Sequence, residues 1–104
     1  RRRSRRMSAQ GGAVTVFAPA GELTMVSAPA VLEDGRRLAR AGDMVVDFAG
    51  VTVADSAALA LLLDWMRCAR AAGNRLAVRG LPAAMASLAA LSDIDALLPL
   101  ESAQ

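Results

Sequence analysis

The stretch that decides the fold is Met44-Val45-Val46-Asp47-Phe48, followed after residues 49–54 by Asp55-Ser56-Ala57-Ala58-Leu59-Ala60-Leu61-Leu62-Leu63-Asp64-Trp65-Met66. The first segment is apolar on both faces of a strand except at Asp47, which is typical of a central strand covered by helices. The second segment is apolar over most of the surface of a helix. The sequence therefore predicts a buried strand followed by a largely buried helix, with Asp55 and the Ser56 hydroxyl at the entrance of that helix.

The segments before this stretch predict two short strands and a helix. Residues 13–18 alternate as a strand, and Pro19 and Gly21 interrupt it before a second extended piece at Glu22-Leu23. The pattern of residues 28–41 predicts a helix, although Gly35 within it has a low helix propensity. Ser27 is expected to cap this helix, and Gly42 to end it.

The segments after the stretch predict a further strand and two helical elements. Gly73-Asn74 favours the left-handed end of the long helix, and residues 75–79 follow as a strand. Residues 83–91 predict a helix, and Ser92-Asp93 a cap for a last short apolar element. Because strands alternate with helices, we expect an α/β fold: a mixed four- to five-stranded β-sheet with about four helices packed on it.

The composition indicates one domain with an aliphatic core. The chain has 104 residues, of which 55% are hydrophobic and only 3% aromatic, so aliphatic side chains must fill the interior. The single cysteine, Cys68, cannot form an intrachain disulfide, and we interpret it as a small buried hydrophobe in a reducing compartment. No apolar run approaches the roughly 20 residues that span a bilayer. These features predict a cytoplasmic protein.

The beginning of the chain carries a cluster of arginines. Five of the twelve basic residues lie within residues 1–6, and the remaining seven arginines and ten carboxylates give a net charge of −3. We expect a disordered basic tail at residues 1–12 and a folded domain at residues 13–101. Such a tail can bind nucleic acid or a membrane surface. Because Met7-Ser8 looks like a translation start, we favour the interpretation that residues 1–6 are not native, with no nucleic-acid partner and no direct membrane insertion.

Missing residue types exclude several classes of enzyme. The chain has no His, Lys or Tyr, so it lacks the parts of a Walker-type phosphate loop, a Schiff base and a Ser-His-Asp or Cys-His nucleophile. One cysteine without histidine does not make a zinc site. The remaining acid or base candidates are Asp47, Asp55, Asp93 and Asp95, of which Asp55 and Asp93 are better explained as helix caps. We predict a protein without catalytic activity, cofactor or metal.

Two features indicate a surface for another protein. Ser56 stands at the positive end of a helix beside small residues, where a partner backbone or a kinase can reach its hydroxyl; a cap formed by Ser56 or Asp55 is the alternative explanation. The long helix has one apolar ridge that can pack on the sheet and a second that we interpret as a docking surface or as further core. The first ridge contains Leu59, Leu62, Leu63 and Met66, and the second Ala58, Leu61, Trp65 and Cys68.

Together these segments resemble the STAS family, which includes bacterial anti-anti-sigma factors, cytoplasmic parts of sulfate transporters and the small subunit of the Mla phospholipid transporter. The resemblance runs from about Val14 to Leu100. It rests on Gly21-Glu22-Leu23, Val45-Val46-Asp47-Phe48, Val53-Ala54-Asp55-Ser56-Ala57-Ala58-Leu59 and Gly73-Asn74-Arg75. The resemblance implies a STAS-type fold.

Within the family, the Mla subunit is the most similar to this chain in the run from Leu59 through Met66 to Ala72-Gly73-Asn74, then in Gly80-Leu81 and Leu97-Leu98-Pro99. This similarity implies a non-catalytic subunit that binds and stabilises or regulates the ATPase of an ABC-type phospholipid transporter. Through that ATPase it would meet a membrane permease, peripheral at the inner membrane. The implied contact residues are Asp55, Ser56, Ala57, Ala58 and Leu59, widened by the neighbouring helix face.

Anti-anti-sigma factors are the alternative within the family. In them the residue after the signature Asp is a serine that an anti-sigma kinase phosphorylates, so the resemblance makes Ser56 a candidate phosphosite. The usual Asp-Ser-Ser-Gly-Leu pattern departs here to Asp55-Ser56-Ala57-Ala58-Leu59, which lacks the glycine that permits close approach of a partner.

Overall fold

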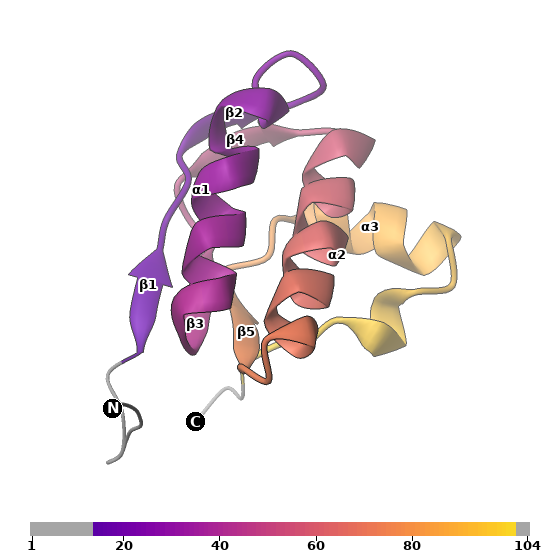
Figure 1. Ribbon diagram of the computed structural model, residues 1–104. Coiled ribbons are helices and arrows are strands. Elements are labelled where there is room, and N and C mark those ends of the chain that lie inside the picture. Colours follow the sequence, from indigo (N-terminus) through magenta and orange to yellow (C-terminus); the bar gives the residue numbers. More distant parts are fainter. Residues whose placement is uncertain (1–13, 102–104) are drawn as a thin grey trace, which may run out of the picture.

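Strands and helices alternate along most of the chain in the computed structural model, which describes residues 14–101 (Figure 1). The strands are β1 (Thr15–Phe17), β2 (Gly21–Leu23), β3 (Met44–Asp47), β4 (Val51–Ala54) and β5 (Leu76–Arg79). The helices are α1 (Ala28–Ala41), α2 (Ser56–Ala71) and α3 (Ala83–Leu91), and a 3-10 turn, η1 (Asp95–Leu97), follows α3. The expected α/β fold is confirmed. The basic tail expected at residues 1–12 lies outside the described residues.

The strands form two small parallel sheets, whereas one mixed sheet was expected. One sheet has the order β1-β3-β5 and the other pairs β2 with β4. A helix connects the two strands of each pair, and such a crossover brings the chain back in the same direction. The described strands are therefore parallel wherever they pair.

The strands divide into two sheets because the chain leaves the extended conformation at two neighbouring places. One break lies between β1 and β2, and the other between β3 and β4. Pro19, between β1 and β2, has no N–H for the strand ladder. Between β3 and β4, the Asp47 carboxylate accepts a hydrogen bond from the Ala49 amide at 2.9 Å and turns the chain. The two breaks lie side by side, because Gly21 donates to the Gly50 carbonyl at 2.9 Å. The strand β4 after this break was not expected from the sequence.

Helices α1 and α2 lie next to each other on the same side of the strands (Figure 1). Trp65 of α2 is completely buried between them, and its indole N–H donates to the Leu32 carbonyl of α1 at 3.0 Å. The Phe17 ring of β1 packs edge-on against this indole, with ring centroids 5.5 Å apart. Gly35 faces the same indole, and a Cβ at this position would overlap it. Trp65 therefore joins α1, α2 and the sheet.

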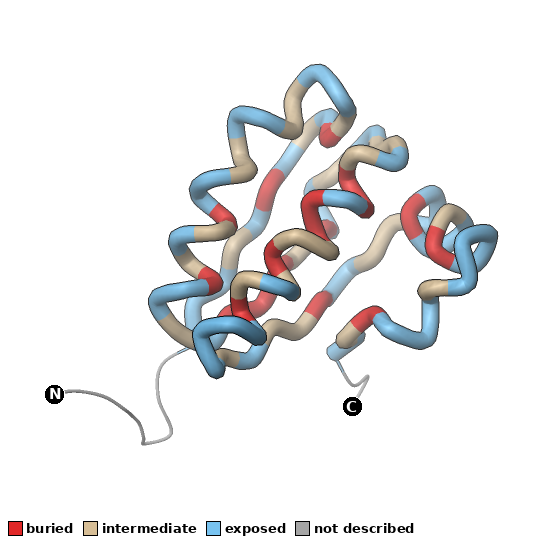
Figure 2. Tube along the Cα trace, turned by 45° about the vertical axis from the view of Figure 1, so that its right-hand side comes forward, coloured by how far each residue is buried: buried red, intermediate tan, exposed pale blue. Residues whose placement is uncertain are grey.

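The core is aliphatic, as the composition predicts. Buried residues line the sides of α1, α2 and the strands that face one another (Figure 2). Among residues 14–101 no polar or charged side chain is fully buried. Chemistry that involves a polar group in this part of the molecule must therefore take place at the surface.

The ends of the helices confirm some of the expected caps and contradict others. Gly73 adopts the expected left-handed conformation, with φ of 77°. Asn74 does not share this conformation; its side-chain amide donates to the carbonyls of Ala39 and Arg40 in the last turn of α1, at 2.9 and 3.2 Å, and Gly42 follows that helix as expected. The expected caps from Ser27 and Asp93 are wrong: neither α1 nor η1 has a side-chain cap, and Asp93 forms a left-handed turn residue with φ of 59°.

Candidate partner-binding site

Asp55 organises the entrance of α2. It has an extended backbone conformation before the helix, and its Oδ1 accepts a hydrogen bond from the Ala57 amide at 2.8 Å. This is the capping role expected from the sequence. Its second oxygen, Oδ2, accepts from the Met25 amide at 3.1 Å. One carboxylate thus caps α2 and attaches to it the loop between β2 and α1.

Ser56 is the first residue of α2, and it is exposed. The cap of the helix comes from Asp55, so the structure decides between the two caps considered from the sequence. The Ser56 hydroxyl therefore lies at the positive end of a sixteen-residue helix without serving as its cap. The position is accessible to another macromolecule.

The loop beside Ser56 carries two apolar side chains that the sequence analysis did not single out. Met25 is 74% exposed and Val26 is 92% exposed. They lie at the tip of the loop formed by residues 24–27, next to the carboxylate of Asp55. We call Met25, Val26, Asp55 and Ser56 the Ser56 corner.

The conformation of this loop is fixed by short hydrogen bonds. The Ser27 hydroxyl donates to the Glu22 carbonyl at 2.8 Å and accepts from the Thr24 amide at 2.9 Å. The Val26 amide donates to the Thr24 hydroxyl at 3.3 Å. These hydrogen bonds order the loop before binding, so the loop loses less conformational entropy when a partner binds.

Three further residues were expected at the contact, and two of them point elsewhere. Ala57 is half-buried, whereas Ala58 is completely buried and Leu59 is only 6% exposed. The side chains of Ala58 and Leu59 belong to the core, since they lie on the side of α2 that faces the sheet and α1. Ala58 and Leu59 pack beneath the first turn of α2 and offer little side-chain surface to a partner.

The second apolar ridge of α2 is also core. Leu61 and Trp65 are buried together with Ala58, so the interpretation of this ridge as a docking surface is wrong. The reason is α1, which packs against α2 on the side that the sheet leaves open. Cys68, expected to be buried, is half-exposed at the far end of the ridge.

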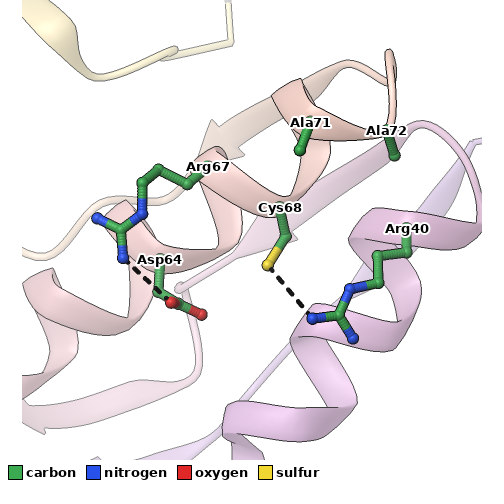
Figure 3. Close-up of a pocket in the computed structure, with 6 residues that line it drawn as sticks. All are labelled: Arg40, Asp64, Arg67, Cys68, Ala71 and Ala72. Atoms are coloured by element: carbon green, nitrogen blue, oxygen red, sulfur yellow. Dashed lines mark hydrogen bonds and ion pairs between the residues drawn. The ribbon is translucent and has the colours of Figure 1, made fainter.

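Cys68 lines a hollow of about 380 Å³ between α1 and α2, together with Arg40, Asp64, Arg67, Ala71 and Ala72 (Figure 3). The Arg40 Nη2 atom is 4.0 Å from the Cys68 sulfur. The guanidinium lies against the sulfur from the neighbouring helix, so the edge of this helix pair is polar.

The carboxylate of Asp64 on α2 links this helix to α1. Arg36 of α1 donates to both oxygens of Asp64, at 2.7 and 3.1 Å, and Arg67 donates to the same carboxylate at 3.3 Å. The hydrogen bonds from Arg36 hold the pKa of Asp64 below its ordinary value of 3.8. They also raise the pKa of Arg36. Asp64 is a structural residue of the α1–α2 interface.

The remaining acid or base candidates are Asp47, Asp93 and Asp95. Asp47 lies 3.8 Å from Arg79, whose hydrogen bond to Glu101 raises the pKa of its guanidinium. Asp93 and Asp95 are exposed near η1. Within residues 14–101, no three His, Cys, Asp or Glu residues are grouped so that they could hold a metal ion.

The sequence of the chain matches the family model described as "Mlab, STAS domain" over residues 7–99. The chain belongs to the STAS domain family. This match includes the Asp55-Ser56 turn and the strands that position it, and it supports a regulatory or binding role in general. No protein in a comparison with curated proteins matches the chain.

The STAS domain has no membrane-crossing helix in the part that the structure describes, because its helices there are too short or too polar.

Proposed function

We propose that this STAS domain is a non-catalytic subunit that binds and regulates or stabilises the ATPase of an ABC-type phospholipid transporter. In this role it works in the cytoplasm, peripheral to the inner membrane, and reaches the permease only through the ATPase. The description of the matching family model supports this choice among STAS functions. The proposal needs no cofactor and no catalytic residue.

The observation that carries the proposal is the Ser56 corner. A small exposed hydroxyl and two exposed apolar side chains, Met25 and Val26, lie next to one another on a surface held by Asp55. Interfaces commonly combine an apolar centre with polar groups that fix the orientation of the partner. The corner has this composition, and its hydrogen-bonded loop needs little rearrangement on binding.

Ser56→Arg tests the proposal in a co-purification with the ABC ATPases of the same genome. The long charged side chain would stand in the contact, so we expect the wild-type chain to retain an ATPase and the variant to lose it. Ser87→Arg is the matched control, because Ser87 is an exposed serine of α3 and lies outside the Ser56 corner. Retention of the ATPase by Ser56→Arg would remove Ser56 from the interface, and capture of no ATPase by the wild-type chain would contradict the proposed function.

A second candidate function is an anti-anti-sigma factor controlled by phosphorylation of Ser56. It is favoured by the exposed hydroxyl in the first turn of α2, where the helix dipole stabilises a phosphate. Incubation with ATP and an anti-sigma kinase, followed by intact mass measurement, distinguishes the two functions. One phosphate per chain, absent in Ser56→Ala, would favour this switch over the transporter subunit.

A further inference from the structure

A groove runs along the second half of α2, beside η1. Its first part is a hollow of about 290 Å³ lined by Leu63, Met66, Arg67, Arg70 and Leu97. Three of these residues are apolar, and Leu97 of η1 is 65% exposed. The two arginines stand three residues apart on α2, so they lie on the same side of the helix.

A second hollow continues the first. It has a volume of about 340 Å³ and shares Met66, Arg70 and Leu97 with its neighbour. Its other lining residues are Ala69, Asn74, Leu76 and Pro99. We call the two hollows together the α2–η1 groove. Its lining residues on α2 run from Leu63 to Arg70, which is about 10 Å at the rise of an α-helix.

The charge of the groove is positive. Arg70 has no ion pair with another residue of the part that the structure describes, and no acidic residue lines either hollow. Arg67 is 76% exposed and shares Asp64 with Arg36, which holds that carboxylate with two hydrogen bonds. Both guanidiniums thus have donors free for a ligand.

We propose that the α2–η1 groove binds an amphipathic segment of a partner protein, with large apolar side chains at helical spacing and carboxylates beside them. The apolar floor would take the apolar side chains, and Arg67 and Arg70 would pair with carboxylates three or four residues apart. A groove of this length contacts about two turns of a bound helix.

Other ligands fit the groove less well. Sites for small molecules enclose most of the ligand, whereas these hollows lie open at the surface of α2. No aromatic residue lines the groove to stack on a nucleic-acid base. A membrane surface attracts clusters of about four to eight basic residues, whereas two arginines, Arg67 and Arg70, line the groove. Two arginines beside an apolar floor match a short protein segment that carries a few carboxylates and apolar side chains.

This inference does not depend on the proposed function. Ser56 and Arg70 stand at opposite ends of α2, about 20 Å apart along the helix axis. The near end of the groove, at Leu63, is about 10 Å from Ser56 along the same axis, so Arg70 is the lining residue of α2 that lies farthest from the corner. Variants of the groove and variants of the corner can be tested separately.

The first test measures the binding of a designed, fluorescein-labelled peptide to the whole chain by fluorescence anisotropy. The peptide forms three helical turns, with leucines spaced by three and four residues and glutamates beside them. We expect saturable binding that becomes at least about tenfold weaker in Arg70→Glu. Arg75→Glu is the matched control, since Arg75 is an exposed arginine without an ion pair in the described chain and lies outside the groove. Equal weakening by both substitutions would overturn the proposal.

A charge exchange makes the test specific. A peptide with lysines in place of the glutamates should bind poorly to the wild-type chain and regain binding to the Arg67→Glu/Arg70→Glu variant. NMR shifts caused by the acidic peptide should map to Leu63, Met66, Arg70 and Leu97. Absence of saturable binding up to about 1 mM peptide, or shifts at Ser56 alone, would overturn the proposal. The proposal would also be overturned if the chain bound phosphatidylglycerol vesicles but not the peptide, and if Arg70→Glu abolished the vesicle binding.

Discussion

Gly35 determines how closely α1 and α2 approach each other. In the middle of a helix, alanine is normally preferred to glycine by about 1 kcal/mol. Here Gly35 is buried against Trp65, and a Cβ would overlap the indole. The local cost of the glycine is therefore offset by a contact that only the folded chain makes.

We expect Gly35→Ala to lower the free energy of unfolding by about 2 kcal/mol, because the helices must separate or the indole must leave its rotamer. Urea denaturation at neutral pH measures this difference. Gly42→Ala is the control: a Cβ there meets no atom within 4 Å, so its effect should remain within about 0.5 kcal/mol. A Gly35→Ala variant as stable as the wild type would show that the core adapts at this contact.

At the scale of elements, Asp55 joins two segments that are far apart in the sequence. Its carboxylate caps α2 through Ala57 and holds the loop of residues 24–27 through Met25. We expect Asp55→Ala to lower the free energy of unfolding by about 2 kcal/mol, since it removes a helix cap and a second hydrogen bond. Asp55→Asn keeps one acceptor oxygen and should lose about half as much.

Amide hydrogen exchange separates the two parts of this prediction. In Asp55→Ala, the Met25 amide should exchange faster together with the amides of the first turn of α2, because both lose an acceptor. Rapid exchange at α2 alone would show that the loop keeps its conformation without Asp55.

The ion pair between Arg36 and Asp64 makes the packing of α1 on α2 depend on pH. The pKa of Asp64 is lower in the folded chain than its ordinary value of 3.8, so the unfolded chain binds a proton at this group first as the pH falls. The contribution to stability is complete above the ordinary pKa and is lost as the pH falls through the folded pKa.

We therefore expect the free energy of unfolding to fall more steeply for the wild type than for Asp64→Asn between about pH 5 and about pH 2. Denaturant titrations at several pH values measure the two slopes. The control is Asp34→Asn, which removes an exposed pair with Arg37 and should change the stability at neutral pH little. Parallel curves for the wild type and Asp64→Asn would contradict a structural role of this carboxylate.

The sequence predicted those elements whose signals are local. Helix α1 has the expected bounds of residues 28–41, and Asp55 and Gly73 have their expected places at the two ends of α2. The strand β4 was missed although Val51, Thr52 and Val53 are β-branched residues that favour strands, because the segment is only four residues long. Its pairing with β2 depends on a crossover through α1, which leaves no signal within the strand itself.

The candidate site was also predicted only in part, because some of its features have a local sequence signal and others depend on contacts between distant segments. The Asp55-Ser56 turn has a local pattern, and the structure exposes Ser56 there as the proposed contact requires. The contribution of Met25 and Val26 depends on the hydrogen bond from Met25 to Asp55, thirty residues away in the sequence. The burial of Ala58, Leu59 and Trp65 depends on the position of α1. A single apolar helix pattern does not distinguish contact with a helix of the same chain from contact with a partner.

For the whole molecule, stability and partner binding rest on different surfaces. Trp65 and its neighbours hold the two helices to the sheet, whereas Met25 and Val26 are among the most exposed apolar side chains of residues 14–101. An exposed side chain buries little area on folding, so its removal costs the fold little. Its burial by a partner would contribute to binding alone.

This separation predicts the behaviour of Met25→Ser/Val26→Ser. Its melting temperature should stay within a few degrees of the wild type, since the change in folding free energy is within about 0.5 kcal/mol. Its affinity for the proposed ATPase partner should fall at least about tenfold, because neither position then has an apolar side chain to bury in the complex. Leu91→Ser is the control, because Leu91 is exposed to a similar extent on α3, outside the Ser56 corner. Unchanged affinity in the double variant, with normal melting, would place the partner on another face of the domain.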